Sequence, residues 1–380
     1  MDCTSPSMLI GANWPKEVLD NPLSLDGDSL SLSGAADAEF SHLDHRNGKR
    51  NVYKFGGTSV GSPSRLCGLV RIVREERDRV LAVVVSAMGH TTDHLLEAVA
   101  FAAKGDADSA LTVVDKIQAQ TLVNAHDTQK ELEVADIEDM TEPLRELLYG
   151  ICLLQEQTAA ATDTVLSFGE RISANIVAKL LTKAGVEAFF LDARDWLTTD
   201  DTHGCAKVLF DESKEKLQHL SEHWKPNTLP VITGFIGSTR SGRTTTLGRN
   251  GSDYTATLVG SSLGADYVLI NTDISGVMTA DPRIVDRAVA LSHLNHHEAL
   301  ELAVYGTRMF HARTMGDVTM LIRNTMDPKG HGTYISGVGR SGTRETCTTS
   351  LENLAIIEAR TRILQDGSTD PHQQGTSVLV

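Results

Sequence analysis

Short apolar runs alternate with amphipathic stretches along most of the chain, and this alternation restricts the fold more than any other feature. Apolar runs that predict buried strands are found at 52–55, 80–86, 186–192, 229–235, 266–271 and 320–323. Helical periodicity is found at 64–78, 170–184, 252–263 and 294–305, and also over 107–164 with expected breaks near 141–143 and Gly150. Strands that alternate with helices form a parallel or mixed sheet covered on both faces, so we predict the α/β class.

Composition and charge exclude several classes of protein. The 380 residues carry a formal net charge of −15 with no dominant basic patch, which makes nucleic acid a poor candidate for the main partner. The longest apolar run, near 80–85, is far shorter than the ~20 residues of a membrane span, so no membrane partner is expected. Five cysteines at wide spacings, without a CxxC pair, are typical of free thiols in a reducing compartment.

The two ends of the chain differ from its middle. Residues 1–48 are rich in Ser, Asp and Gly, and we predict a disordered acidic tail there. Frequent acids and scarce arginines in this tail do not support a transit peptide, so we expect a cytoplasmic protein, with a plastid location as the alternative. Residues 337–350 are predicted to be a linker. Their Gly337-x-Gly339-x-x-Gly342 pattern has the spacing of a dinucleotide fingerprint, but no helix pattern follows it.

The segment KFGGTSV, from Lys54 to Val60, carries the sharpest chemical signal. A predicted strand runs directly into two glycines and two hydroxyls, and a predicted helix follows. Glycines let backbone N–H groups approach an anion, a helix start attracts it, and a lysine adds a point charge for phosphates. The pattern lacks the spacing of a Walker A loop, and it is consistent both with a phosphate site and with a tight turn between strand and helix.

Two further segments combine charged side chains with turns. In TTTLGRNGSDY, at 244–254, Arg249 can hold a carboxylate bidentately, whereas Ser252 and Asp253 could simply be the N-cap and first turn of a helix. In NTDISGVMTADPR, at 271–283, a predicted strand ends in Thr-Asp. Open α/β sheets bind ligands at this position, and an ordinary turn is the alternative.

Two weaker patterns favour structural roles. Ser167–Arg171 is predicted to begin a helix, with Glu170 as the favourable acid of its first turn. His293, His296 and His297 are predicted to lie on a helix and to face solvent rather than bind a metal.

Taken together, these segments resemble the aspartate kinases of the amino-acid kinase superfamily, over about Asn51 to Ser336. The blocks that carry the resemblance are KFGGTSV (54–60), VVSAMGHTTD (84–93), SFGER (167–171), ITGFIG (232–237), TTTLGRNGSDY (244–254), NTDISGVMTADPR (271–283), EALELAVYGTRMFHARTM (298–315) and IRNTMDPKGHGTYI (322–335). Their spacing looks most similar to the kinase part of bifunctional aspartate kinase–homoserine dehydrogenases. The resemblance implies a catalytic domain at 49–336 that is an α/β/α sandwich. Its mainly parallel sheet should have roughly eight strands, with the sites along the carboxyl-terminal edge.

The resemblance implies that MgATP and L-aspartate react to give 4-phospho-L-aspartate and ADP, the first step of lysine, threonine and methionine biosynthesis. Because the substrate carboxylate is already anionic at pH 7, no general base is needed; the site must position two anions and neutralise the transferred phosphoryl group. By resemblance, the substrate-binding residues are Thr92, Glu170, Arg249, Gly251 and Ser252. The catalytic residues are Lys54, Asp253 and Arg308. The ATP-binding residues are Lys54, Gly56, Gly57, Thr58, Ser59, Thr272, Asp273, Arg283 and Arg308.

Individual roles follow from position in the motifs. Arg249 is expected to pair with the α-carboxylate of aspartate, and Glu170 with its ammonium group. Asp253 is expected to orient the cationic groups or the Mg²⁺ ion, and no side chain is assigned as a dedicated metal ligand. Arg308 departs from the family, which commonly has Lys there; arginine keeps the charge but not the point-like ammonium geometry.

The C-terminus departs most from the family. Aspartate kinases usually continue into two ACT regulatory domains, whereas 351–380 is predicted to be the remnant of one truncated domain. We therefore expect an enzyme without feedback control by lysine or threonine, which could be a homo- or hetero-oligomer. The alternative is a catalytically weak kinase-fold protein that binds nucleotide or pairs with a full-length enzyme. A superfamily kinase for glutamate, N-acetylglutamate or a nucleotide is a third candidate.

Overall fold

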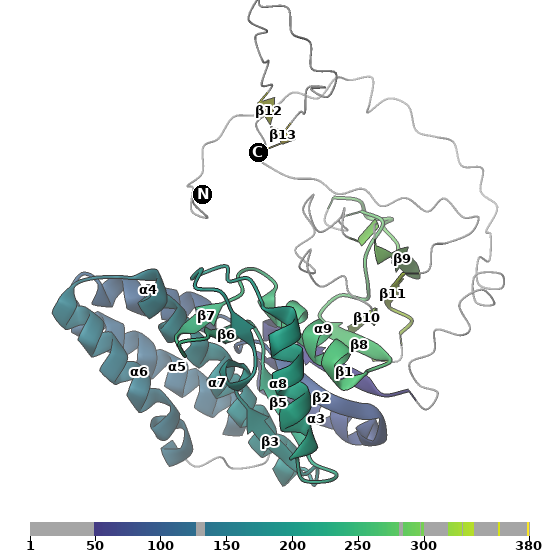
Figure 1. The fold of residues 1–380 in the computed structure, drawn as a ribbon, viewed down its shortest axis with the longest axis horizontal. Coiled ribbons are helices and arrows are strands. Elements are labelled where there is room, and N and C mark those ends of the chain that lie inside the picture. Colours follow the sequence, from purple (N-terminus) through teal and green to yellow (C-terminus); the bar gives the residue numbers. More distant parts are fainter. Residues whose placement is uncertain are drawn as a thin grey trace, which may run out of the picture. The chain divides into compact units, whose positions relative to one another are not determined.

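An eight-stranded sheet forms the centre of the larger of the chain's two compact units (Figure 1). The computed structural model describes residues 49–126, 134–280, 284–296, 298–299, 318–328 and 330–337, together with 356–357 and 378–379. In spatial order the strands are β3 (Ala188–Leu191), β5 (Leu229–Thr233), β2 (Val80–Val85), β1 (Asn51–Phe55), β8 (Tyr267–Thr272), β10 (Thr319–Asn324), β11 (Thr333–Ser336) and β9 (His293–Asn295).

The neighbouring strands of this sheet run parallel, except that β10 and β11 pair antiparallel. The central strands β1 and β2 are buried along almost their whole length, which explains why their sequences are continuous apolar runs instead of alternating ones. The predicted sandwich with a mainly parallel sheet of eight strands is therefore confirmed.

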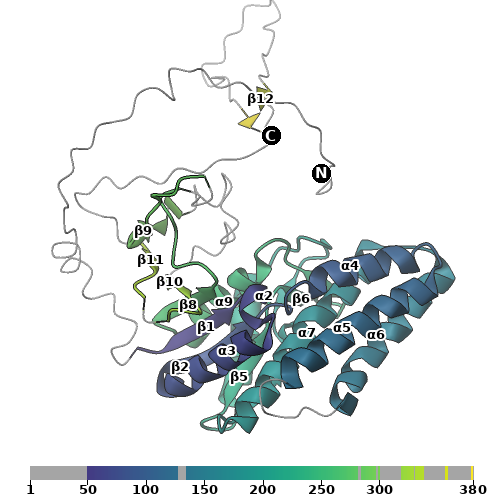
Figure 2. The same cartoon turned by 180° about the vertical axis from the view of Figure 1, so that it is seen from behind.

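Helices cover both faces of the sheet and create two hydrophobic cores. They are α2 (Gly57–Val60), α3 (Pro63–Glu75), α4 (Thr91–Ala102), α5 (Ala107–His126), α6 (Val134–Leu154), α7 (Ala159–Lys183), α8 (Phe210–Glu222) and α9 (Gly251–Leu263), with single 3-10 turns η2 (Arg77–Arg79) and η3 (Ala193–Asp195). Alternate side chains of a strand point to opposite faces, so Tyr53 and Phe55 enter the core under α3 to α7, whereas Val52 enters the core under α8 and α9. In Figure 1 α8 lies in front of the sheet, and in Figure 2 α3 does.

A second sheet of three short strands lies beside the site described below. It consists of β4 (Thr198–Thr199), β6 (Ile236–Thr239) and β7 (Thr244–Thr246), in the order β4-β6-β7. The apolar run at 229–235 was predicted as one strand, but β5 ends at Thr233, and Phe235 adopts a left-handed φ of 68° that turns the chain into β6. The run is apolar on both sides of this turn, so the pattern alone did not show the break.

The predicted breaks near Thr141–Pro143 and at Gly150 were wrong, because both positions lie inside α6. A proline inside a helix removes one hydrogen bond and costs about 3 kcal/mol or more. Leu144 and Leu148 are fully buried, and α6 packs against α4, α5 and α7. The free energy gained by this burial exceeds the local cost of the proline. A sequence pattern gives no measure of that gain, because it depends on the neighbouring helices.

The helix predicted to begin around Ser167–Arg171 begins earlier, at Ala159. The hydroxyl of Thr158 caps it by accepting a hydrogen bond from the backbone N–H of Ala161 at 3.1 Å. Glu170 is therefore in the middle of α7, far from the positive helix end that was expected to stabilise its charge.

The helix predicted over 294–305 is a strand at its start. Residues His293–Asn295 form β9, which pairs with β11, a strand that the sequence analysis missed. His293 is 2% exposed, and its Nε2 lies 2.9 Å from the hydroxyl of Ser336, so it does not face solvent as predicted. Strands β9 and β11 lie far apart along the chain, so no local sequence pattern predicts that they pair.

The remaining described elements are β12 (Ile356–Ile357) and β13 (Val378–Leu379), which pair antiparallel in a unit of their own. The predicted tail at 1–48, nearly all of the predicted linker, and the segment with Arg308 lie outside the described residues. Among the helices that the structure describes, none is long and apolar enough to cross a bilayer. The assignment of 351–380 as a domain remnant stays a prediction.

Candidate active site

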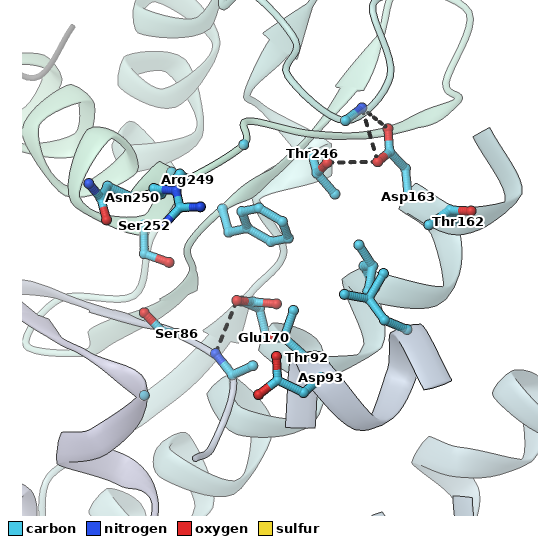
Figure 3. Close-up of a pocket in the computed structure, with 18 of the residues that line it drawn as sticks. Ser86, Thr92, Asp93, Thr162, Asp163, Glu170, Thr246, Arg249, Asn250 and Ser252 are labelled. Atoms are coloured by element: carbon cyan, nitrogen blue, oxygen red, sulfur yellow. Dashed lines mark hydrogen bonds between the residues drawn. The ribbon is translucent and has the colours of Figure 1, made fainter. Parts of the chain in front are cut away.

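One pocket of about 850 Å³ opens where β1, β2 and β5 end and α9 begins (Figure 3). Its walls come from the loops after those strands, from α4 and α7, and from the chain between β7 and α9. Of the residues predicted to act in the site, it brings together Lys54, Gly57, Thr92, Glu170, Arg249, Gly251, Ser252 and Asp253. Parallel strands present their carboxyl ends at one edge, which is why motifs distant in sequence meet there.

Lys54 and Asp253 form a buried ion pair at this edge. The Nζ of Lys54, in β1, lies 2.6 Å from Oδ1 of Asp253, in the first turn of α9, and the two side chains are only 10% and 6% exposed. A buried charge is tolerated when it is paired with an opposite charge, and each of these two side chains supplies that partner for the other. The acid also lies near the positive end of α9, where a negative charge is favourable. The pair fixes an ammonium group in the pocket wall.

The glycine loop after β1 packs directly on the loop after β2. The backbone N–H of Gly89 donates to the carbonyl of Gly57 at 3.0 Å, and the backbone N–H of Gly56 donates to the carbonyl of Asn271 at 3.3 Å. A Cβ atom built on Gly57 would lie 2.8 Å from the carbonyl oxygen of Ala87, which is closer than real contacts allow. Glycine is therefore required at position 57, because the backbone there lies too close to the carbonyl of Ala87 to leave room for a side chain.

A matched pair of alanine substitutions tests this requirement. Gly57→Ala should destabilise the protein by about 1–3 kcal/mol, because the clash is with backbone that cannot move freely. Gly56→Ala should change stability by less than about 0.5 kcal/mol, because its Cβ would lie an ordinary contact distance of 3.4 Å from the Nζ of Lys54 and its φ of −71° suits alanine. Urea unfolding measures both, and equal midpoints for the two variants would contradict the packing argument.

Glu170 projects from α7 into the pocket and is 3% exposed. Its Oε1 accepts a hydrogen bond from the backbone N–H of Ala87 at 3.0 Å, whereas its buried Oε2 has no hydrogen-bond partner among the described residues. Burial raises the pKa of this carboxyl to about 8, against the opposing effects of backbone hydrogen bonds and the charge of Lys54. A buried acid with one unsatisfied oxygen in a pocket is suited to receive a cationic group of a ligand.

Arg249, Gly251 and Ser252 line the pocket from the start of α9. Asn250 precedes the helix with a left-handed φ of 59°, and α9 begins at Gly251, so Ser252 lies in the first turn and is not the N-cap. Arg249 is exposed and forms no ion pair within the part of the chain that the structure describes. A free guanidinium beside a helix N-terminus is suited to bind a carboxylate.

A cluster around Asp163 forms the wall opposite Arg249, with Glu170 between them (Figure 3). Asp163 is 1% exposed, and its carboxylate accepts hydrogen bonds from the hydroxyl of Thr246 at 2.7 Å and the backbone N–H of Gly204 at 3.0 Å. The Nδ1 of His203 lies 2.9 Å from the same carboxylate. The sequence analysis missed this cluster. A signal was present, because Asp163 stands two helical turns before Glu170 and so shares its face.

Those predicted ATP-binding residues that the structure describes lie at the same sheet edge, and their exposure differs. Thr272 is half-buried at the end of β8, which pairs with β1, whereas Thr58 and Asp273 are exposed. Ser59 is buried, and its hydroxyl lies 2.8 Å from that of Thr325, so it holds the glycine loop against the end of β10. Two predicted ATP-binding residues, Arg283 and Arg308, lie outside the described residues.

Comparisons with known proteins agree with this architecture. The model of the amino acid kinase family matches residues 49–319. Aspartokinase 1, a chloroplastic protein of Arabidopsis thaliana, is 33% identical over 333 residues, which cover 82% of this chain and 57% of the relative. A chloroplastic bifunctional aspartokinase/homoserine dehydrogenase 2 of Zea mays is 32% identical over 81% of this chain and 35% of the relative. The chain thus spans about half the length, or less, of these curated relatives.

Two solved structures have a similar fold. Aspartokinase III of E. coli, in complex with aspartate and ADP, superimposes with a TM-score of 0.70 at 30% identity, over 82% of this chain and 68% of the other. The aspartate kinase of Clostridium acetobutylicum superimposes with a TM-score of 0.64 at 25% identity, over 77% of this chain and 64% of the other.

Proposed function

Since the chain belongs to the amino acid kinase family, we propose that it is an aspartate kinase, which transfers the terminal phosphoryl group of ATP to the side-chain carboxylate of L-aspartate. The observation that carries the proposal is the charge arrangement of one pocket. A buried acid with an unsatisfied oxygen, Glu170, and a free guanidinium, Arg249, line it together with the fixed ammonium of Lys54. These groups match the ammonium and α-carboxylate of a free amino acid and the phosphates of a nucleotide.

The proposed mechanism relies on positioning and charge neutralisation. The nucleophilic carboxylate of aspartate has a reference pKa of about 3.9, so it attacks without a general base. Glu170 and Arg249 hold the two α-groups, which directs the side-chain carboxylate toward the phosphoryl group. Lys54 stabilises the negative charge of the transferred group, and Asp253 keeps its ammonium in place at 2.6 Å.

Mg²⁺ enters this proposal as part of the substrate MgATP, since Mg²⁺ keeps several waters and binds largely through phosphate oxygens. Asp253 is the acid beside Lys54 and therefore the side chain best suited to approach the ion, although the ion pair already uses one of its oxygens. Asp163 does not fit this role because protein donors already bond to both of its oxygens.

The hydroxamate assay for acyl phosphate tests the function directly. The purified 380-residue chain with MgATP and L-aspartate should form aspartyl hydroxamate, and L-glutamate or N-acetylglutamate in place of aspartate should not. Folded protein that binds ATP but forms no acyl phosphate would instead support the weak or partner-dependent alternative. The expected insensitivity to lysine and threonine stays a prediction, which the same assay checks with each amino acid at millimolar concentration.

The location of the protein in the cell also stays a prediction. The relatives in Arabidopsis thaliana and Zea mays are chloroplastic by name, whereas our expectation for this chain is the cytoplasm, with the plastid as the alternative. A fluorescent fusion to the full chain would place it in one compartment or the other.

The Asp163 cluster predicts an effect on aspartate binding alone. The bond from Thr246 to Asp163 fixes the end of β7, three residues before Arg249, relative to α7, which carries Glu170. Thr246→Val should therefore raise the KM for aspartate roughly tenfold, since a hydrogen bond to a charged group is worth about 1.5–3 kcal/mol. Thr246→Ser, which keeps the hydroxyl, is the matched control and should behave like the wild type. An equal rise in the KM for ATP would argue against this assignment.

A further inference from the structure

The last turn of α8 and its C-cap residue carry a group of potential metal ligands outside the pocket. His219, Glu222 and His223 each offer one ligand atom, and these atoms all lie within 4.8 Å of one another. Within the described ranges this is the one such group of three or more histidine, cysteine or acidic side chains. We propose that these three residues form a binding site for a divalent transition-metal ion of the zinc type.

The spacing of the three residues suits a single ion. Residues three and four positions apart lie on the same face of a helix, so both imidazoles and the carboxylate project to one side. The pattern H-x-x-E-H also places two metal-binding imidazoles in one class of zinc enzymes. None of the three side chains lines the pocket, so the proposal concerns binding and not a second catalytic centre.

The imidazole of His223 is oriented in the way that metal-binding histidines are. Its Nδ1 lies 2.9 Å from the backbone carbonyl oxygen of His219, which fixes Nδ1 as the protonated nitrogen that donates to the carbonyl. The lone pair is then on Nε2, which is available to a metal. A hydrogen bond from the non-coordinating nitrogen to a backbone carbonyl is the usual support for a histidine ligand.

The local field favours a cation. The carbonyl end of a helix carries partial negative charge, and His223 is the C-cap residue of α8. Glu222 adds a full negative charge on the same face, and the Nδ1 of His219 already lies 3.7 Å from its carboxylate. The nearest lysine in sequence, Lys225, does not compete for this carboxylate because its Nζ pairs with Glu187 at 2.5 Å.

The donor set also selects the ion. Two imidazole nitrogens and one carboxylate suit Zn²⁺, Ni²⁺ or Cu²⁺, whereas Mg²⁺ and Ca²⁺ prefer oxygen ligands alone. Zinc bonds of about 2.0–2.2 Å require the ligand atoms to move closer together. All three side chains are exposed and can rotate to do so. A water molecule would complete a four-coordinate site.

The bound ion would stabilise the end of α8 and its contact with α9. Gln218, which precedes His219, donates from its side-chain amide to the carbonyl of Ser262 in α9 at 3.0 Å, and the two helices pack against each other. An ion that binds only the folded chain stabilises it by mass action. We therefore expect zinc to raise the melting temperature without taking part in phosphoryl transfer.

Zinc titration of the 380-residue chain against a chromophoric chelator tests the site. The double variant His219→Gln/His223→Gln should bind one zinc ion fewer per chain than the wild type. Each single variant should bind that ion at least about tenfold more weakly, since even the loss of an outer-shell partner has an effect of this size. The matched control is His90→Gln, another exposed histidine, which should retain the site. Mg²⁺ should not compete.

Thermal unfolding supplies a second readout that does not depend on activity. Without metal, the double variant should melt with the wild type, because both imidazoles are exposed. Zinc should raise the melting temperature of the wild type and of His90→Gln more than that of the double variant. Equal zinc stoichiometry and equal thermal shifts in wild type and double variant would overturn the proposal, whatever the outcome of the kinase assay.

Discussion

Lys54→Met should abolish aspartyl phosphate formation while leaving ATP binding detectable. Removing one electrostatic donor from a transferred group typically lowers kcat by about 10²–10³, and Lys54 is the one lysine that lines the described pocket. The hydroxamate assay measures the loss in kcat, and titration with ATP checks binding. Activity within tenfold of wild type would contradict the role of Lys54.

The same substitution should also destabilise the protein, for a separate reason. It leaves the carboxylate of Asp253, 6% exposed, buried without its partner, and breaking a buried pair in this way costs about 3–5 kcal/mol. The double variant Lys54→Met/Asp253→Asn removes the stranded charge. It should therefore recover most of the lost stability and none of the activity, which separates folding from catalysis. If the double variant stays as unstable as the single one, the ion pair is not the source of the destabilisation.

Glu170→Gln should change affinity and stability in opposite directions. Losing the charged partner of the substrate ammonium should raise the KM for aspartate by about 10–100-fold, since a hydrogen bond to a charged group is worth about 1.5–3 kcal/mol. The ligand-free protein should become more stable at pH 8, by on the order of 4 kcal/mol, because folding at this pH requires Glu170 either to take up a proton or to bury a charge, and a neutral amide requires neither. Kinetics and urea unfolding measure the two effects.

The pH dependence of both effects follows from the raised pKa. The folded chain keeps the Glu170 proton up to about pH 8, whereas the unfolded chain loses it near the ordinary value of 4.5. The contribution of this group to stability is therefore fully present below pH 4.5 and is lost as the pH rises through 8. Glu170→Gln should remove this decline.

Aspartate binding should show the reverse trend, because the ammonium group of the substrate requires the ionised acid. Affinity of the wild type should rise as the pH increases from 6 to 8, by up to about tenfold per unit for a single proton, and then level off. Glu170→Gln should show no such rise. A wild-type affinity that is flat over this range would mean that Glu170 is already ionised in the free enzyme.

The motifs and the class of fold were readable from sequence because both depend on local patterns. Continuous apolar runs predicted the buried parallel strands. The motifs KFGGTSV and GRNGSD predicted two of the segments that contribute residues to the pocket. Where tertiary packing opposed a local signal, the structure differs from the prediction. Pro143 did not break α6, and His293 was placed on a helix although it lies in a strand whose partner is far along the chain.

The chemical groups available to the site follow from the sequence alone: a lysine after a strand, an arginine before a helix, and an acid on a long helix. The environment of each group depends on the tertiary fold. The start of α9 packs against the end of β1, which places Oδ1 of Asp253 2.6 Å from the Nζ of Lys54. Burial of Glu170 on α7 leaves one of its carboxyl oxygens without a hydrogen-bond partner among the described residues and raises its pKa to about 8. Distance and desolvation set charge and affinity, and neither is a property of a residue's neighbours in sequence.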